Sequence, residues 1–382
     1  MHAQSFLKAA LWAVVAVVTQ TAYGQYGQPP GPQGYAYPAG YGQGDPMAPM
    51  PEVDASTMGE GMPSDMGGGM YDMGQCGPCY QGWTHRYNVF GEFLYLRARN
   101  AEIAYGFRAD DPLAGDPALP IGRVGVVDPD FSSGFRIGGG VTLDETSSLQ
   151  LTYTEFDETT ANTLIASGTD AIRPLVLQPL SPNALENFTD AGATQTLQFK
   201  LVDADYRGLV AYSDIYKVNY LIGARYAKLD QDFDAGFNLG DIETVSSTVN
   251  FDGGGLRFGF EAERYGNNNQ LFVYGKTYAS LIGGEFRANY LQANPGDEDV
   301  AFTTFRAGRL VSIYDMEVGA GWANYCGNFR VSAGYTFSIW CNTLKNNEFI
   351  TAVQTNNFVD LSDTDNAMLS FDGFVVRAEL LW

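Results

Sequence analysis

Hydrophobic and polar residues alternate with a period of two over much of the chain after residue 85. In residues 134–144 (GFRIGGGVTLD) the apolar set is Phe135, Ile137, Val141 and Leu143, and the intervening positions are mostly glycine, arginine and threonine. Further segments with this alternation are 149–154, 216–226, 256–263, 315–322, 329–337 and 374–382. Such alternation is typical of β-strands whose two faces meet different surroundings. The pattern predicts an all-β domain.

The chemistry of the polar face separates a membrane barrel from a soluble sandwich. In a sandwich this face meets bulk water and favours long charged side chains, whereas here it carries many glycines and small residues beside a few arginines and glutamates. Such a lining suits the interior of a closed, tilted sheet whose large apolar groups point outward to hydrocarbon. Strands of about ten residues would also cover an apolar band roughly 25 Å high. We therefore predict an antiparallel transmembrane β-barrel.

The connections between the predicted strands alternate in length. Short ones fall at residues 145–148, 210–214, 266–269 and 325–328, and longer ones near 100–132, 158–193, 229–253, 283–309 and 339–368. This order gives about ten strands with both chain ends on the short-turn side, as bacterial outer-membrane barrels require. A further hairpin within residues 103–127 or 301–311 would raise the number to twelve.

The first 84 residues have a different composition from the predicted barrel. Lys8, the apolar run 9–18 and the Ala-Tyr-Gly sequence before residue 25 predict a secretory signal peptide at residues 1–24. The run is too short to span a bilayer, which takes about 20 residues. Residues 25–84 are rich in glycine, proline and methionine and are predicted to be a disordered periplasmic segment. The predicted barrel is the remainder, residues 85–382.

Cysteine positions test the predicted strand order. Cys76 and Cys79 form a CGPC sequence like a thioredoxin centre, but glycine-rich coil precedes it, so a small structural disulfide is favoured. Cys326 and Cys341 flank one predicted strand, which separates them by about 35 to 40 Å. That is far beyond the reach of a disulfide. If Cys326 is bonded, its predicted partner is Cys76 or Cys79.

Charge and histidine content exclude several classes of function. The net charge of −22 argues against nucleic acid as a partner. The acid is concentrated in predicted loops such as residues 109–120, 294–299 and 360–366, which we interpret as solvated surface, with a cation-attracting vestibule as the alternative. After cleavage the chain keeps one histidine, His85, ahead of the first strand, so no catalytic residue is predicted. No cofactor and no metal ligand are predicted either.

Charged residues set which face of each strand points inward, because an arginine or lysine in lipid at mid-depth costs about 2 to 4 kcal/mol. If Glu92 points inward, so do Phe90 and Leu94 on the same strand. Asp203 and Asp205 fall on the outward face in this interpretation, near the periplasmic end of their strand. The candidate pore-lining residues are Arg136, Lys200, Lys217, Arg225, Arg257, Glu261, Glu263, Asp315, Glu317, Arg330, Arg377 and Glu379. Their charges nearly balance, so no ion selectivity is predicted.

The last strand, 374–382, carries Phe374, Val376, Leu380 and Trp382 on its predicted lipid face. Its terminal aromatic resembles the signal that the barrel assembly machinery of the outer membrane recognises, which makes that machinery an expected partner.

Several strings resemble the pore-forming outer membrane proteins typified by the Legionella major outer membrane protein. They are GEFLYLRAR, SGFRIGGGVTL, YLIGARYAKLDQDF, GGGLRFGFEAE, YGKTYASLIGG and DMEVGAGW, and they cover most of the chain after His85. The resemblance implies a Gram-negative-type outer membrane and a passive channel. It supplies no catalytic residues.

Together these observations predict a porin-like passive pore for small solutes or ions. Its expected surroundings are outer-membrane lipid, and a homo-oligomer is compatible with the sequence. The alternative is a structural or adhesive barrel with a filled lumen and functional acidic external loops. The predicted strand number allows both, because barrels of about eight strands are filled by side chains and those of about sixteen leave a wide lumen.

Overall fold

The computed structural model describes residues 85–110, 119–213, 215–266, 270–294, 297–359, 361 and 368–382. The predicted signal peptide and the predicted disordered segment lie outside these residues.

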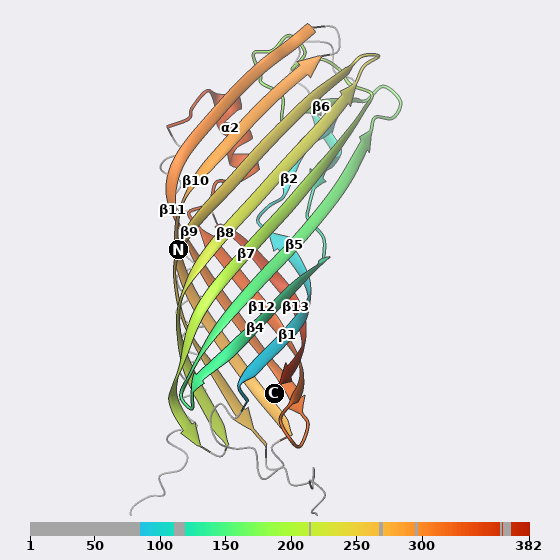
Figure 1. Cartoon of the computed structure of the whole chain (residues 1–382). Helices are drawn as coiled ribbons and strands as arrows, with labels where there is room; N and C mark the ends of the chain where they lie inside the picture. The colour runs from blue at the N-terminus through green and yellow to red at the C-terminus, as the bar shows by residue number, and fades with distance from the viewer. Residues whose placement is uncertain are drawn as a thin grey trace, which may run out of the picture. The chain divides into compact units, whose positions relative to one another are not determined.

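Within the described residues, ten antiparallel strands form a closed barrel, as predicted (Figure 1). The wall runs in the order β1-β13-β12-β11-β10-β9-β8-β7-β5-β4, and β4 pairs with β1. The strands are β1 (Tyr87–Arg99), β4 (Ser132–Asp144), β5 (Ser147–Ile165), β7 (Asp190–Ser213), β8 (Tyr216–Asn238), β9 (Ile242–Tyr265), β10 (Leu271–Asn294), β11 (Asp297–Ala323), β12 (Phe329–Cys341) and β13 (Met368–Leu381).

The four short connections predicted from the sequence separate consecutive strands of the wall. Residues 145 and 146, for example, join β4 to β5. Tyr87 and Trp382 lie at the same end of the barrel and exchange two backbone hydrogen bonds, of 2.9 and 3.0 Å, across the β1–β13 seam. We call this end the turn end and the opposite end the loop end.

Two of the predicted long loops are wrong. Residues 229–253 belong mostly to β8 and β9, and residues 283–309 mostly to β10 and β11. The strands continue well past the predicted membrane band. Beyond it their inner face is apolar and their outer face is polar. Residues 301–311, considered as a separate hairpin, are part of β11.

The inner and outer faces of the wall exchange character partway along the strands. On β8, Ile222 and Tyr226 point outward and are 51% and 47% exposed, whereas Leu229 and Phe233 point inward and are fully buried. The outward positions that follow Tyr226 are polar, among them Asp234. From Tyr216 to Tyr226, about ten residues rise roughly 25 Å, the height of a lipid band. Beyond that level the barrel is built like a water-soluble one, with a dry interior.

The interior at the loop end is filled by chain segments that fold into it. They contain β2 (Ile103–Ala109), β3 (Pro120–Val127), β6 (Ala171–Pro174) and α2 (Asn346–Thr355). β2 pairs with β3 and β6 in a separate sheet, so the hairpin considered at residues 103–127 exists but adds no strand to the wall. We call these four elements and the segments that join them to the wall the plug.

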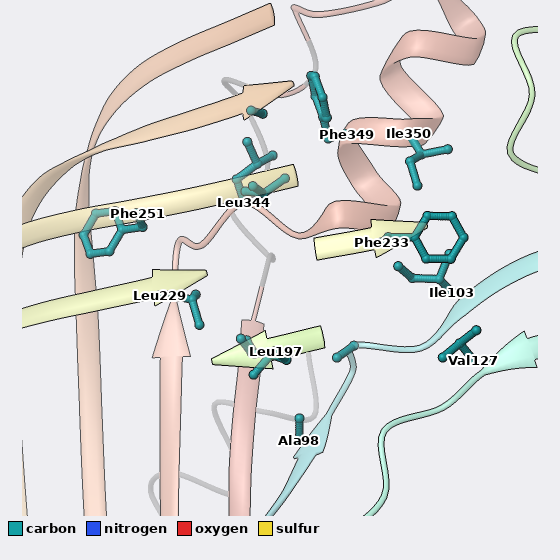
Figure 2. Packing of buried hydrophobic residues seen from close by; sticks show 14 of the residues in the cluster. Ala98, Ile103, Val127, Leu197, Leu229, Phe233, Phe251, Leu344, Phe349 and Ile350 are labelled. Carbon is teal, nitrogen blue, oxygen red and sulfur yellow. The ribbon is translucent and has the colours of Figure 1, made fainter. Parts of the chain in front are cut away.

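Apolar side chains pack the plug against the inner face of the wall. Figure 2 shows Phe349 and Ile350 of α2 in one buried cluster with Ile103 of β2 and Phe233 of β8. Phe349 is fully buried and its ring lies 6.4 Å from that of Phe305 on β11.

Inward amides tie the plug to the wall through backbone groups. Gln195 of β7 donates to the carbonyl of Ala101 at 2.8 Å, and Gln231 of β8 donates to that of Leu344 at 2.8 Å. Both amides are buried, so these bonds fix the plug where no water competes.

The two cysteines of the described region are not joined to each other, as predicted. Cys341 is a free thiol, whereas Cys326 is disulfide-bonded. The predicted partners of Cys326 lie outside the described residues. No helix in the described ranges is long and apolar enough to cross a membrane.

Candidate functional site: the charged lumen

Between the plug and the turn end, the barrel interior is lined by charged side chains that pair with one another. Each cation in this set has an anion to match it. The cations are Arg136, Arg207, Lys217, Arg225, Arg257, Lys276, Arg330 and Arg377, and the anions are Glu92, Asp203, Asp205, Glu261, Glu263, Asp315, Glu317 and Glu379.

Strand register places opposite charges side by side. Glu92 on β1 lies directly between Arg136 on β4 and Arg377 on β13. The Glu92 carboxylate accepts hydrogen bonds from both guanidinium groups, at 2.6 and 2.9 Å, and the residue is only 4% exposed. Phe90 and Leu94, its neighbours on the same face, are also buried, as predicted.

The same rule holds on the opposite wall. Lys276 on β10 is in register with Glu261 on β9 and with Glu317 on β11. Its ammonium group donates to Glu317 Oε1 at 2.7 Å. Arg207 of β7 reaches Glu261 across β8. Opposite charges directly across strands stabilise the sheet, here in a setting largely withdrawn from water.

The layer nearest the plug centres on Arg225. Its guanidinium holds Asp203 through two hydrogen bonds of 2.6 and 2.9 Å and Asp315 through one of 2.6 Å. Arg257 contacts Asp203 at 3.4 Å and also binds Asp205. Paired geometry of this kind fixes both partners.

The prediction that Asp203 and Asp205 point outward is wrong, since both are inward and 3% exposed. The prediction for Lys200 on the same strand is wrong for the same reason: its side chain lies on the outer face, 36% exposed, and pairs with Glu155 at 3.0 Å. Lys200 lies beyond the level where the faces exchange character, so an outward charge there meets no lipid.

The structure places all the other predicted residues on the inner face, where they line the lumen. Sequence reasoning missed Lys276, Arg207 and Tyr278. Their strands were ambiguous in phase or assigned the wrong phase. On β7 the signal was the exposed, outward pair Val202 and Tyr206, because alternation then places Asp203, Asp205 and Arg207 inward.

Interior glycines make room for these large side chains. Gly223 on β8 lies in register between Asp205 and Arg257, which meet across it. Gly259 on β9 is opposite Tyr278, and a Cβ there would lie 2.6 Å from the carbonyl oxygen of Thr277. The glycine-rich polar face of the sequence is therefore a packing requirement.

Cavities lie among these side chains in the described part of the lumen. One of about 270 Å³ includes His85, Lys217 and Arg330 among its lining residues, at the turn end. The other, of about 60 Å³, lies deeper among the ion pairs and reaches Phe199 and Phe371.

An aromatic layer separates the charged lumen from the plug. The rings of Phe156, Phe199, Trp340 and Phe371 pack together, with centroids 4.7 Å apart for Phe199 and Phe371 and 5.3 Å apart for Phe156 and Phe199. Each of these side chains is at most 4% exposed. Interiors packed in this way leave few voids as large as a water molecule.

The chemistry that this arrangement shows is ion pairing. Among the described residues, no group of three or more histidine, cysteine, aspartate or glutamate side chains could hold a metal ion. His85 is at the turn end, and the lumen carboxylates are engaged with cations.

A closed ten-strand barrel with a charged lining and an outward apolar band is a transmembrane barrel of the outer-membrane class. Residues 78–381 match the family model described as Legionella pneumophila major outer membrane protein precursor. The chain belongs to this family of outer membrane proteins, which confirms the resemblance inferred from its sequence.

Several solved structures match the chain at low sequence identity. No curated protein matches the chain. The outer membrane protease OmpT from Escherichia coli is 13% identical over 78% of this chain and 97% of its own, with a TM-score of 0.42. The Pseudomonas putida toluene transporter TodX is 6% identical over 78% and 90%, with a TM-score of 0.29. A Pseudomonas aeruginosa FadL homologue is 8% identical over 78% and 90%, with a TM-score of 0.21.

Proposed function

We propose that this protein is a structural, surface-exposed barrel of the outer membrane whose lumen is closed by packing, and that it is not a permanently open passive pore. The observation that carries the proposal is the buried layer of Phe156, Phe199, Trp340 and Phe371 beneath the plug. A solute passing from one end to the other would have to displace this layer.

In this proposal the turn end faces the periplasm and the loop end faces the outside, as is usual for barrels with short periplasmic turns. The N-terminal segment is then periplasmic. Surface contacts are made by the loop end of the barrel, and no catalytic role is assigned. Outer-membrane lipid, the assembly machinery acting on the Trp382 strand and self-association remain proposed partners.

The second candidate is the porin-like pore predicted from the sequence. The turn-end cavity and the polar lining of the membrane band favour it. A purely structural barrel needs neither, because an interior filled with apolar side chains would hold its wall together equally well. In such a pore the plug and the aromatic layer would move aside spontaneously, so the wild type would show current steps.

Conductance of the purified, folded full chain in planar bilayers separates the two candidates. We expect no discrete current steps from the wild type. The double variant Trp340→Ala, Phe371→Ala removes half of the aromatic layer that packs in one cluster with the plug, so the plug loses support and current steps are expected. Trp322→Ala, at an outward position 41% exposed, is the matched control and should behave like the wild type. Regular steps from the wild type would overturn the closed-lumen proposal in favour of the pore.

A further inference from the structure

The segment that joins the plug to the wall lies where strand β4 has ended. β4 begins at Ser132, in register with Leu96 of β1, and its pairing with β5 reaches as far as Phe156. Beyond this level β1 and β5 continue toward the loop end without β4 between them. Residues 128–131, which we call the linker, connect β3 of the plug to β4 here. The linker is therefore one of the two stems of the β2–β3 hairpin.

Two side chains hold the linker, one from each neighbouring strand. Arg97 of β1 donates from Nε to the carbonyl of Pro129 at 2.7 Å and pairs with Asp128 at 2.8 Å. Glu158 of β5 accepts, at Oε1, the backbone N–H of Asp130. A backbone acceptor and a backbone donor of the linker are thus satisfied by side chains instead of by a strand.

The Glu158 carboxyl group is poorly compensated where it lies. The residue is 4% exposed and lies past Glu155 on β5 toward the loop end, outside the lipid band. Its Oε1 also accepts from the Thr160 hydroxyl at 3.1 Å, but its Oε2 is buried and has no hydrogen-bond partner among the described residues. An ionised Oε2 is a buried charge without a partner, whereas the neutral acid leaves only a hydroxyl group there, which costs much less.

The charges that act on Glu158 come from the linker and from β1. Asp130 of the linker repels an ionised carboxyl group, and Arg97 of β1 attracts it but is paired with Asp128. On β7 the residue in register with Glu158 is Leu197, which has no charge. Burial, reinforced by Asp130, raises the pKa of Glu158 to about 7, against the opposing effect of its hydrogen bonds and of Arg97. Its charge therefore changes near neutral pH.

We propose that Glu158 is a pH-sensitive clasp for the β2–β3 hairpin, closed while its carboxyl group is neutral and released when the group ionises. On release the linker leaves Oε1 and water hydrates the carboxylate. A solvated glutamate has a pKa of about 4.3, below that in the closed clasp. The stabilisation is thus complete below about pH 4.3 and is lost as the pH rises through about 7. This goes beyond the proposed function and holds whether or not the lumen conducts.

Thiol labelling of the folded full chain in detergent tests the clasp in a Cys341→Ser background. Val127→Cys reports release, because Val127 ends β3 beside the linker and is fully buried in the cluster of Figure 2. Asp234→Cys, at an exposed position, gives the reactivity of an open thiol at each pH. Labelling of the Cys341→Ser parent is subtracted from both. We expect the ratio of the two maleimide rates to rise about tenfold from pH 6 to pH 8, through the ionisation of one group.

Glu158→Gln keeps the acceptor at Oε1 but cannot ionise. Its rate ratio should stay within about twofold of the wild-type value at pH 6 over the whole range. Glu155→Gln makes the same change on the outer face and should keep the tenfold rise. The proposal is overturned if the wild-type ratio does not change with pH or if Glu158→Gln shows the same rise as the wild type.

Electrophoresis with and without heating establishes that each variant is folded. If Val127→Cys does not fold, Ile103→Cys, on β2 of the same hairpin and 2% exposed, replaces it. If Glu158→Gln does not fold, hydrogen exchange of residues 127–132 in the wild type replaces it. Protection of these amides, relative to an unstructured peptide, should then fall about tenfold from pH 6 to pH 8, and constant protection overturns the proposal.

Discussion

At the scale of single residues, the lumen depends on charges that are largely withdrawn from bulk water. Glu92 illustrates this, because it is nearly fully buried and is held by Arg136 and Arg377 at once. Removing one partner of a buried ion pair leaves the other charge buried and uncompensated. The resulting loss of folding stability is larger than the net stabilisation that the intact pair provides.

Glu92→Gln is therefore expected to destabilise the folded barrel by about 3 to 5 kcal/mol. Urea unfolding in detergent micelles, followed by the heat-dependent electrophoretic shift, measures the change. Glu155→Gln is the control, since the Glu155–Lys200 pair is partly exposed on the outer face and is worth about 0 to 1 kcal/mol. Equal losses in the two variants would contradict this account of the lumen.

A second prediction at this scale concerns the effect of filling the space beside an interior glycine. Gly259→Ala places a Cβ against Tyr278 and the Thr277 carbonyl and should cost about 1 to 3 kcal/mol of unfolding free energy. Gly275→Ala, on the neighbouring strand, meets nothing within 4 Å and should change it by less than about 0.5 kcal/mol. The same unfolding assay compares them, and a tolerated Gly259→Ala would show that the lumen is loosely packed.

At the scale of the element, each long strand serves two environments. The inward and outward positions of β8 stay in phase along its length, while the chemistry of the two faces is exchanged after Tyr226. One strand thus contributes to a lipid-facing wall and then to the wall of a soluble, apolar-cored barrel.

Lysine scanning along β8 checks this division. Ile222→Lys places a charge in the lipid band and should cost about 2 to 4 kcal/mol in liposomes. Asp234→Lys, at an outward position on the same strand beyond the exchange level, should change the free energy of unfolding by less than about 0.5 kcal/mol. If Asp234→Lys proved as costly as Ile222→Lys, the lipid band would have to extend much further along the barrel.

Much of the fold could be predicted from alternation and turn spacing, including the ten strands and the β1–β13 closure. The length of the strands could not be predicted. The run from Leu229 to Phe237 alternates apolar residues with aspartates, and if lipid is assumed outside the barrel these aspartates exclude a strand and indicate a polar loop. Lys200 and Asp203 were misassigned by the same assumption. The plug was also missed, since its short elements are stable only through contacts with the wall.

At the scale of the whole molecule, the proposed orientation puts the plug and the polar outer wall outside the cell. Intact cells treated with a membrane-impermeant maleimide test it in a Cys341→Ser background, because Cys341 is a free thiol. Asp234→Cys is expected to be labelled on intact cells. Glu145→Cys, in a turn at the turn end, should be labelled only after lysis. The reverse pattern would invert the barrel.

The β1–β13 seam has a consequence for biogenesis. The wall acquires its last hydrogen bonds only when the two most distant strands of the sheet meet, so two unpaired edges persist until then. Pairing between remote segments is slow, and exposed edges invite association with other chains. We therefore expect a nascent chain of this kind to need a partner that shields both edges during transit and releases them together.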